Sequence, residues 1–324
     1  MTTREHINDY FNGQGFMILC ALALIVATTV TVLLGVAPHE GSTPGIFFSL
    51  KGALIDHQPS SAIVNVLCLL ATGGILLALN KVFTFVRAVT RLFVSAFFLL
   101  QLADPAGLVA LNAGTLLCLV TALAVMPLFA SYQDRHSQRS IFLIFALVAS
   151  GSMFHYAFLA LIPAFILGFI NMGVLNLKGV LAMLFGLVTP FWIVLGLGIV
   201  RPAEAVAPQW LFWDRLPMTP LVVLASAIAV LGIVLAVINF RTIMNYRMQT
   251  RVYNAFFIIL LVLTVIVMCL DYHNLAVYLP LLELMLSLQI AQVHTLSTFS
   301  HRYIFLLLFI VGCLGFCVEN LMLS

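Results

Sequence analysis

Charged residues are scarce in this sequence, and their scarcity excludes most classes of soluble protein. Lysine, arginine, aspartate and glutamate make up 8% of the 324 residues, whereas a soluble domain carries about 25%. Hydrophobic residues make up 63% of the chain, and the mean hydropathy is +1.18. Apolar runs recur along nearly the whole length, and a run of about 20 residues spans a bilayer as a helix. The composition predicts an all-α, polytopic transmembrane bundle that forms one membrane domain over residues 1–324.

Three further absences each exclude an alternative. The apolar runs lack the period-two alternation of an outer-membrane β-barrel. Residues 1–15 lack a compact basic region and a small-residue cleavage site, so the first apolar run is predicted to be retained rather than removed as a signal peptide. No nucleotide-binding, nucleophile-elbow or metalloprotease motif occurs. We therefore expect no cofactor and no nucleic-acid partner, and any chemistry must use lipid-borne or periplasmic substrates.

Cysteine use argues against a disulfide framework. All six cysteines fall inside predicted spans, where a buried thiol behaves as a small hydrophobe. Cys313 and Cys317 lie one helical turn apart, a spacing that could bind a metal. Only Glu319 is near them in the sequence, and no histidine accompanies them. We expect neither disulfides nor a metal site.

The apolar runs divide into eleven predicted helices. These cover residues 16–37, 62–80, 88–103, 106–130, 140–154, 157–175, 179–200, 218–238, 252–270, 274–294 and 302–322. With the N-terminus in the cytoplasm, eleven arginines and lysines fall on the inner side, and only Lys51, Arg201 and Arg215 on the outer side. This bias follows the positive-inside rule. It predicts a bacterial inner-membrane protein with a cytoplasmic segment at 1–15, outer loops at 38–61 and 201–217, and an outward C-terminus.

Two predicted helices are short for a bilayer. Residues 140–154 would span about 22 Å at 1.5 Å per residue, against a hydrocarbon core of about 30 Å, and residues 88–103 are only slightly longer. Non-helical backbone at membrane depth is tolerated where protein buries it or water lines it. The outer ends of these helices, near Asp104 and His155, are therefore predicted to border an outward-facing cavity.

Acidic residues accumulate on the predicted outer side, which reflects either a polar site or simply the absence of bases there. The candidates for a catalytic acid or base are Asp56, Asp104 and Asp271. Arg201 and Arg215 could hold a lipid phosphate, because a guanidinium forms paired hydrogen bonds with phosphate oxygens. The other candidates for substrate contact are His155, His273, Trp210 and Trp213. For the tryptophans, the alternative is anchoring at the level of the lipid headgroups.

Glu283 lies near the middle of a predicted helix, where an acid costs at least about 2.5 kcal/mol on insertion scales. One interpretation makes it a proton or cation site, with Ser287 and His294 as an inward relay. The other makes it a hydrogen-bond partner that holds helices together. Its possible partners are then Gln101, Asn112, Asn171 and Tyr278. Because Gln289 and Gln292 point in other directions, this helix is expected to lie centrally in the bundle.

Two stretches carry a resemblance to a known family. Residues 130–170 read ASYQDRHSQRSIFLIFALVASGSMFHYAFLALIPAFILGFI, and residues 185–193 read FGLVTPFWI. They resemble a family of multi-pass membrane proteins of Bacteroidota, whose members share a Y-Q-x-R loop, a short helix, an aromatic pair, a Pro-containing apolar helix and a later G-L-x-T-P. The resemblance covers about the central third of the chain. It implies an inner-membrane protein and no particular activity.

The layout of short helices with an amphipathic first outer loop is also similar to multi-span glycosyltransferases that use polyprenyl-phosphate sugars. That resemblance implies a catalytic acid in the first outer loop, where Asp56 or Glu40 is the positional match. It favours a protein of cell-envelope glycan or lipid biogenesis that handles a polyprenyl-phosphate-linked sugar at the outer leaflet. The alternatives are a non-catalytic subunit that scaffolds an envelope complex with another membrane protein, and a secondary transporter centred on Glu283.

Overall fold

The apolar runs fold into helices in the computed structural model, which describes residues 10–39, 45–48, 58–86, 90–201, 206, 219–244, 246–296 and 302–323. Eight helices are long and apolar enough to cross a membrane: α2 (Gln14–Leu33), α4 (Gln58–Phe83), α7 (Ala113–Ala130), α10 (Leu177–Gly196), α11 (Pro220–Ile243), α12 (Met248–Leu270), α13 (Leu275–Leu296) and α14 (Arg302–Leu323). Three shorter apolar helices lie between them: α5 (Leu92–Leu102), α8 (Gln138–Phe154) and α9 (Leu161–Asn171). No strand occurs among the described residues. The all-α prediction is confirmed for the described residues, and each predicted segment overlaps one of these helices. Eight of them are long enough to span a membrane, so the count of eleven spans stays a prediction.

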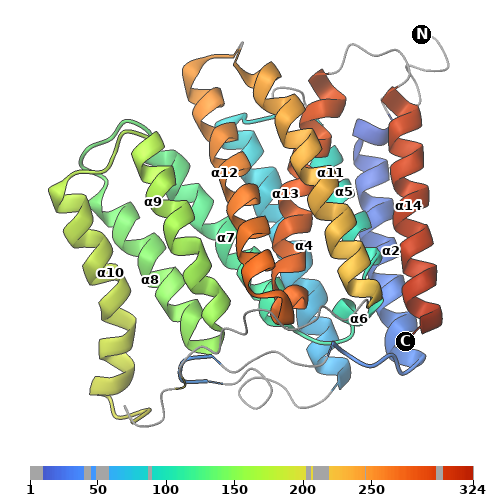
Figure 1. Ribbon diagram of the computed structural model, residues 1–324, viewed down its shortest axis with the longest axis horizontal. Coiled ribbons are helices and arrows are strands. Elements are labelled where there is room, and N and C mark those ends of the chain that lie inside the picture. Colours follow the sequence, from blue (N-terminus) through green and yellow to red (C-terminus); the bar gives the residue numbers. More distant parts are fainter. Residues whose placement is uncertain are drawn as a thin grey trace.

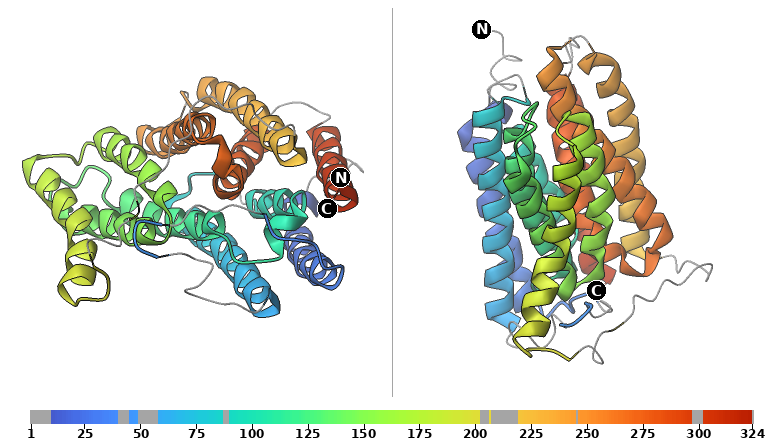
Figure 2. Two further views of the ribbon diagram at one scale, coloured as in Figure 1. Left: turned by 60° about the horizontal axis from the view of Figure 1, so that its bottom comes forward. Right: turned by 90° about the vertical axis from the view of Figure 1, so that its left-hand side faces the viewer.

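Successive helices run up and down one layered bundle (Figure 1). Viewed from a tilted direction, the bundle has an elongated outline (Figure 2). Helix α10 forms one edge and packs mainly against α8, while α2 and α14 form the opposite edge. Both α10 and α14 expose most of their apolar residues, as helices bordering lipid do.

Helix α13 lies at the centre of the bundle, as its polar residues predict. It packs against α5, α7, α11 and α12, and 89% of the residues in its most apolar stretch are buried. A helix that carries carboxylate, amide and imidazole groups cannot face lipid on those sides, because unpaired polar groups are costly in hydrocarbon. The central position follows from that cost.

Helix α5 is short and wholly buried. Its eleven residues are all inaccessible to solvent and lipid, and they span about 16 Å at 1.5 Å per residue. It packs against α13 and α2. Asp104 therefore follows a helix that ends inside the bundle.

The segment predicted as one helix over 106–130 is broken in two. A single turn, α6 (Pro105–Leu108), precedes α7. Between them, the side chain of Asn112 accepts a 2.7 Å hydrogen bond from the backbone N–H of Thr115 and caps α7. An Asn at this position satisfies an N–H that has no partner inside the helix, which is why α7 restarts there.

The segment predicted as one helix over 157–175 also differs from the expectation. It opens with a 3-10 turn, η1 (Tyr156–Ala160), and only then becomes α9. It ends at Asn171 because Gly173 adopts a left-handed φ of 71°, a conformation that glycine tolerates and that stops helices.

The two ends of the bundle carry opposite charge. One end, here called the basic end, holds the start of α2. Because successive helices alternate in direction, the same end also holds these described bases: Lys81, Arg91, Arg135, Arg139, Lys178, Arg241, Arg247 and Arg251. The other end, here called the acidic end, holds Asp104, Asp271 and Glu319, with Arg201 as its one described arginine.

Helices α7 and α13 approach closely at Gly114, near the acidic end. A Cβ atom at this position would lie 2.6 Å from the carbonyl oxygen of Val277 and 3.0 Å from two ring carbons of Pro280. Cys118, one turn further along α7, donates a 3.3 Å hydrogen bond to the carbonyl of Pro280. The absence of a side chain at Gly114 allows this contact.

We expect Gly114→Ala to lower the thermal unfolding midpoint of the protein in detergent, because the added methyl group overlaps backbone of α13. Overpacking of this kind costs about 1–3 kcal/mol. Gly74→Ala in α4 is the matched control, because a Cβ there meets no atom within 4 Å, and Gly→Ala in an open helical position stabilises by about 0.5–1 kcal/mol. Equal midpoints for the two variants would contradict the close approach.

Candidate functional site

The acidic end contains a histidine–carboxylate pair formed by two distant segments. His39, which follows α2, places its Nε2 atom 2.8 Å from both carboxylate oxygens of Asp104. The His39 side chain is 24% exposed and that of Asp104 is 12% exposed. The imidazole is thus held by a nearly buried carboxylate while part of the ring stays accessible.

The turn that carries Asp104 is fixed by its neighbours. Asn65 of α4 donates hydrogen bonds of 3.0 Å and 3.3 Å to the carbonyls of Gly107 and Leu108 in α6. The Asp104 carboxylate folds back over Gly107, whose Cβ would lie 2.6 Å from Oδ2. The absence of a side chain at Gly107 thus leaves room for the carboxylate in the orientation in which it meets His39.

Two effects compete at His39. Burial lowers the pKa of the ring, but the hydrogen bond to Asp104 and the negative charge of that carboxylate raise it more, so the pKa lies above its ordinary value of 6.5. The carboxylate favours the protonated imidazole because opposite charges attract at this distance. The pair therefore suits proton exchange near neutral pH.

A second buried carboxylate, Asp271, lies in the turn between α12 and α13. Its Oδ2 atom accepts hydrogen bonds from the phenols of Tyr156 (3.0 Å) and Tyr278 (2.9 Å), and its Oδ1 atom accepts one from Asn274 (2.9 Å). The Asn274 amide also donates to the Tyr156 oxygen. These four residues, here called the Asp271 cluster, join η1, η3 (Tyr272–Asn274) and α13.

His155 and Asp271, both predicted as site residues, come together although they lie far apart in the sequence. The His155 ring stacks on that of Tyr156 with centroids 5.0 Å apart, and the charge of Asp271 acts on it. Its Nδ1 atom accepts a 3.1 Å hydrogen bond from the backbone N–H of Ala157. His273, in contrast, is exposed.

Described parts of the two outer loops meet at the end of α8. The backbone N–H groups of Ile46 and Phe48 donate to the carbonyls of Ser152 and Met153. The N–H of Val206 donates a 3.0 Å hydrogen bond to the carbonyl of Ile46. The loops at 38–61 and 201–217 are thus tied to the turn that carries His155.

The remaining outer candidates are only partly placed. Arg201 is exposed and follows α10, at the edge of the bundle opposite to α6, so it is not brought together with Asp104 (Figure 1). Asp56, Trp210, Trp213 and Arg215 lie outside the described residues.

Glu283 forms one of the hydrogen bonds considered from the sequence. Gln101 of α5 donates a 2.6 Å bond to Glu283 Oε2, while Oε1 is buried with no hydrogen-bond partner. The two ion pairs among the described residues do not involve this carboxyl group. Glu283 interacts electrostatically with Asp104 and with the thiols of Cys118 and Cys313.

The other residues proposed as partners of Glu283 are engaged elsewhere. Asn112 caps α7, Asn171 donates to the carbonyl of Val252, and Tyr278 bonds Asp271. Of the proposed relay, Ser287 donates to the carbonyl of Leu284 in its own helix, and His294 is buried near the basic end.

Two amide pairs on α13 have no counterpart in the sequence predictions. Gln289 accepts a hydrogen bond from Asn239 of α11, and Gln292 donates to Asn254 of α12. The sequence carried a signal for both partners, because an asparagine within an apolar run needs a polar neighbour in lipid.

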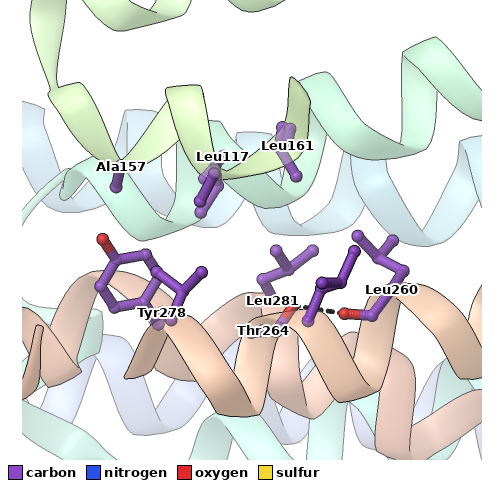
Figure 3. Close-up of a pocket in the computed structure, with 10 residues that line it drawn as sticks. Leu117, Ala157, Leu161, Leu260, Thr264, Tyr278 and Leu281 are labelled. Atoms are coloured by element: carbon purple, nitrogen blue, oxygen red, sulfur yellow. Dashed lines mark hydrogen bonds between the residues drawn. The ribbon is translucent and has the colours of Figure 1, made fainter. Parts of the chain in front are cut away.

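A small cavity lies beside the Asp271 cluster, between Tyr278 and Ala157 at one end and Leu260 and Thr264 at the other (Figure 3). Its volume is about 10 Å³, room for about one water molecule. It cannot hold a substrate, so the outward-facing cavity stays a prediction. No group of three or more His, Cys, Asp or Glu side chains with metal-binding geometry occurs in the part of the chain that the structure describes.

Removing the Tyr156 hydroxyl should destabilise the Asp271 cluster. Tyr156→Phe deletes a donor to Asp271 and an acceptor for Asn274, and leaving such buried groups unpaired costs about 1–3 kcal/mol. Tyr272→Phe is the control, because the Tyr272 hydroxyl is buried without a hydrogen-bond partner and its loss should be neutral. Thermal unfolding of both variants tests this, and an equal shift would show that the cluster contributes nothing.

The His39–Asp104 pair should make stability depend on pH. Because the folded-state pKa of His39 is raised, its contribution is complete below the unfolded value of about 6.5 and is lost as the pH rises through the folded value. We expect His39→Gln to flatten the decline of the unfolding midpoint as the pH rises above about 6.5. If the variant and the wild type decline in parallel, the pair does not titrate as described.

Comparison with known proteins adds no family to this description, because no family model, no curated protein and no solved structure matches the chain.

Proposed function

We propose that the protein is a multi-pass inner-membrane protein of cell-envelope glycan or lipid biogenesis that handles a polyprenyl-phosphate-linked substrate at the outer leaflet. The observation that carries this proposal is the His39–Asp104 pair, a partly accessible imidazole held by a nearly buried carboxylate at the acidic end. The chemistry would be transfer from a lipid phosphate to a hydroxyl acceptor, without nucleotide or metal bound by the chain.

The orientation in this proposal places the basic end in the cytoplasm. The eight long and three shorter apolar helices of the described residues alternate in direction, and the basic end holds eight of the described bases. The proposal takes all eleven as spans. The positive-inside rule orients such a protein with its arginines and lysines inward. Eleven spans then leave the N-terminus inside and the C-terminus outside.

In the proposed reaction, His39 acts as general base. Its Nε2–H is held by Asp104, so Nδ1 is the nitrogen that would accept the proton of an acceptor hydroxyl. Asp104 would stabilise the imidazolium that results, and positioned acid–base groups of this kind accelerate transfer by about 10²–10⁴-fold. The hydroxyl oxygen would attack the sugar carbon, and the lipid phosphate would leave.

The phosphate would be held by arginine from the second outer loop. The candidates are Arg215, which lies outside the described residues, and Arg201, which the structure does not bring together with Asp104, so the proposal requires this loop to approach the His39–Asp104 pair when the substrate binds. The hydrogen bond between Val206 and Ile46 joins this loop to the first outer loop. His39 belongs to that first loop, and Gly45, the next described residue after it, lies six positions further along the chain. A guanidinium suits the task because it forms paired, charge-assisted bonds with phosphate oxygens.

A transporter centred on Glu283 is the second candidate. It is favoured by one observation, the buried Oε1 atom that lacks a hydrogen-bond partner. An intramembrane carboxyl group in that state could take a proton or a small cation. A non-catalytic scaffold would instead use the apolar outer faces of α10 and α14 to contact another membrane protein.

Native mass spectrometry of the protein extracted gently from its own membrane tests the lipid proposal. We expect the wild type to retain a polyprenyl-phosphate species and the double variant Arg201→Ala/Arg215→Ala to lose it. Arg241→Ala, an exposed arginine at the basic end, is the control and should leave retention unchanged. A co-purifying protein subunit with no such lipid would reject the proposal and favour the scaffold.

A further inference from the structure

The basic end contains a pocket formed by two short connections. It lies between the loop joining α7 to α8 and the loop joining α9 to α10, and its volume is about 460 Å³. Five residues line it: Arg135, Ile170, Gly173, Leu175 and Asn176. This pocket is on the end of the molecule opposite to the His39–Asp104 pair and plays no part in the proposed reaction.

Hydrogen bonds fix the two loops to each other. The side chain of Asn176 donates a 2.8 Å bond to the carbonyl of Arg135, and the N–H of Gln133 donates a 3.1 Å bond to the carbonyl of Met172. Both ties use backbone carbonyls, so they do not occupy the Arg135 guanidinium. The pocket is therefore built before any ligand arrives.

One cation lines the pocket, and two more follow its lining residues Arg135 and Asn176 by four and two positions in the sequence. Arg135 lines it, while Arg139 and Lys178 lie in the first turns of α8 and α10, which touch where Gly179 meets Ile141. All three cationic side chains are exposed.

The nearby acid, Asp134, offers little competition to an incoming anion. Its two carboxylate oxygens already accept hydrogen bonds from the Ser137 hydroxyl and the His136 N–H. Three cations against one carboxylate leave a net positive surface.

The lining is apolar as well as cationic. Ile170 and Leu175 line the pocket, and Ile170 is 55% exposed. Leu177, which starts α10 directly after the lining residue Asn176, is 79% exposed. A free phosphate would gain nothing from these side chains. A lipid would place its headgroup against Arg135 and its acyl chains along the helices, where the hydrocarbon begins.

We infer that this pocket binds the phosphate of an anionic glycerophospholipid, with Arg135, Arg139 and Lys178 as its cationic ligands and Ile170 and Leu177 beside the acyl chains. In the proposed orientation the pocket faces the cytoplasmic leaflet, whose lipids carry negative charge. Each basic residue near that leaflet strengthens the attraction between the protein and these lipids.

The test uses the full-length protein in nanodiscs made from equal parts of phosphatidylglycerol and phosphatidylcholine. Native mass spectrometry after release should show the wild type retaining phosphatidylglycerol in preference to phosphatidylcholine. Because each cation at such a surface changes affinity by about fivefold, the double variant Arg135→Gln/Lys178→Gln should bind phosphatidylglycerol about 25-fold more weakly. The Asn176 tie to the Arg135 carbonyl survives this change, so the loops keep their arrangement.

Arg241→Gln/Arg247→Gln is the matched control, because it removes two exposed cations of the same end that belong to α11 and the start of α12. Retention of phosphatidylglycerol by this control, together with loss from the first double variant, supports the site. Equal loss from both would mean that general charge rather than a pocket attracts the lipid, and would overturn the inference. Displacement of the lipid by excess inorganic phosphate would overturn it too, because the ligand would then be the free anion.

Discussion

The structure depends on one constraint: the polar side chains of α13 each need at least one hydrogen-bond partner inside an apolar bundle. An unpaired polar group in hydrocarbon costs several kcal/mol, and Glu283, Gln289 and Gln292 all lie on this helix. Each is met by an amide from a different neighbour. These amides are Gln101 of α5, Asn239 of α11 and Asn254 of α12. The three helices must surround α13 at matching depths, so the pairs set both which helices are adjacent and how far each is inserted.

The two ends of the bundle use charge in different ways. At the basic end, Arg135, Arg139 and Lys178 are exposed, as residues that only need to meet water and headgroups would be. At the acidic end, Asp104 and Asp271 are 9% and 3% exposed, and each has specific partners. Acids collected there merely for lack of bases would have no reason to be buried, because burying a charge is costly unless it is paired. The burial therefore favours a polar site over the simpler explanation.

Periodicity and polarity along single helices were sufficient to predict much of the fold. The apolar runs predicted the helices, and the scattered amides of α13 predicted its central position. Gln101, which bonds Glu283, was one of four partners considered from the sequence. The break before α7 was missed, although Asn112 three residues before Thr115 is a local capping signal. His39 as the partner of Asp104, and Tyr156 as a partner of Asp271, were missed for another reason. These contacts join residues 65 and 115 positions apart, and no local pattern records which loops meet.

The way α10 is attached has a consequence for the motions of the molecule. Within the described residues this helix packs mainly against α8, with a ring contact between Phe191 and Phe47 beyond it. Only 11% of the residues in its most apolar stretch are buried, and segments with few buried residues open locally at a lower free energy than the rest of a protein. Amide hydrogen exchange would then proceed in α10 by a sub-global opening that leaves α13 protected. Such an opening would uncover the α8 face and give lipids, or another helix, a lateral entrance to the bundle.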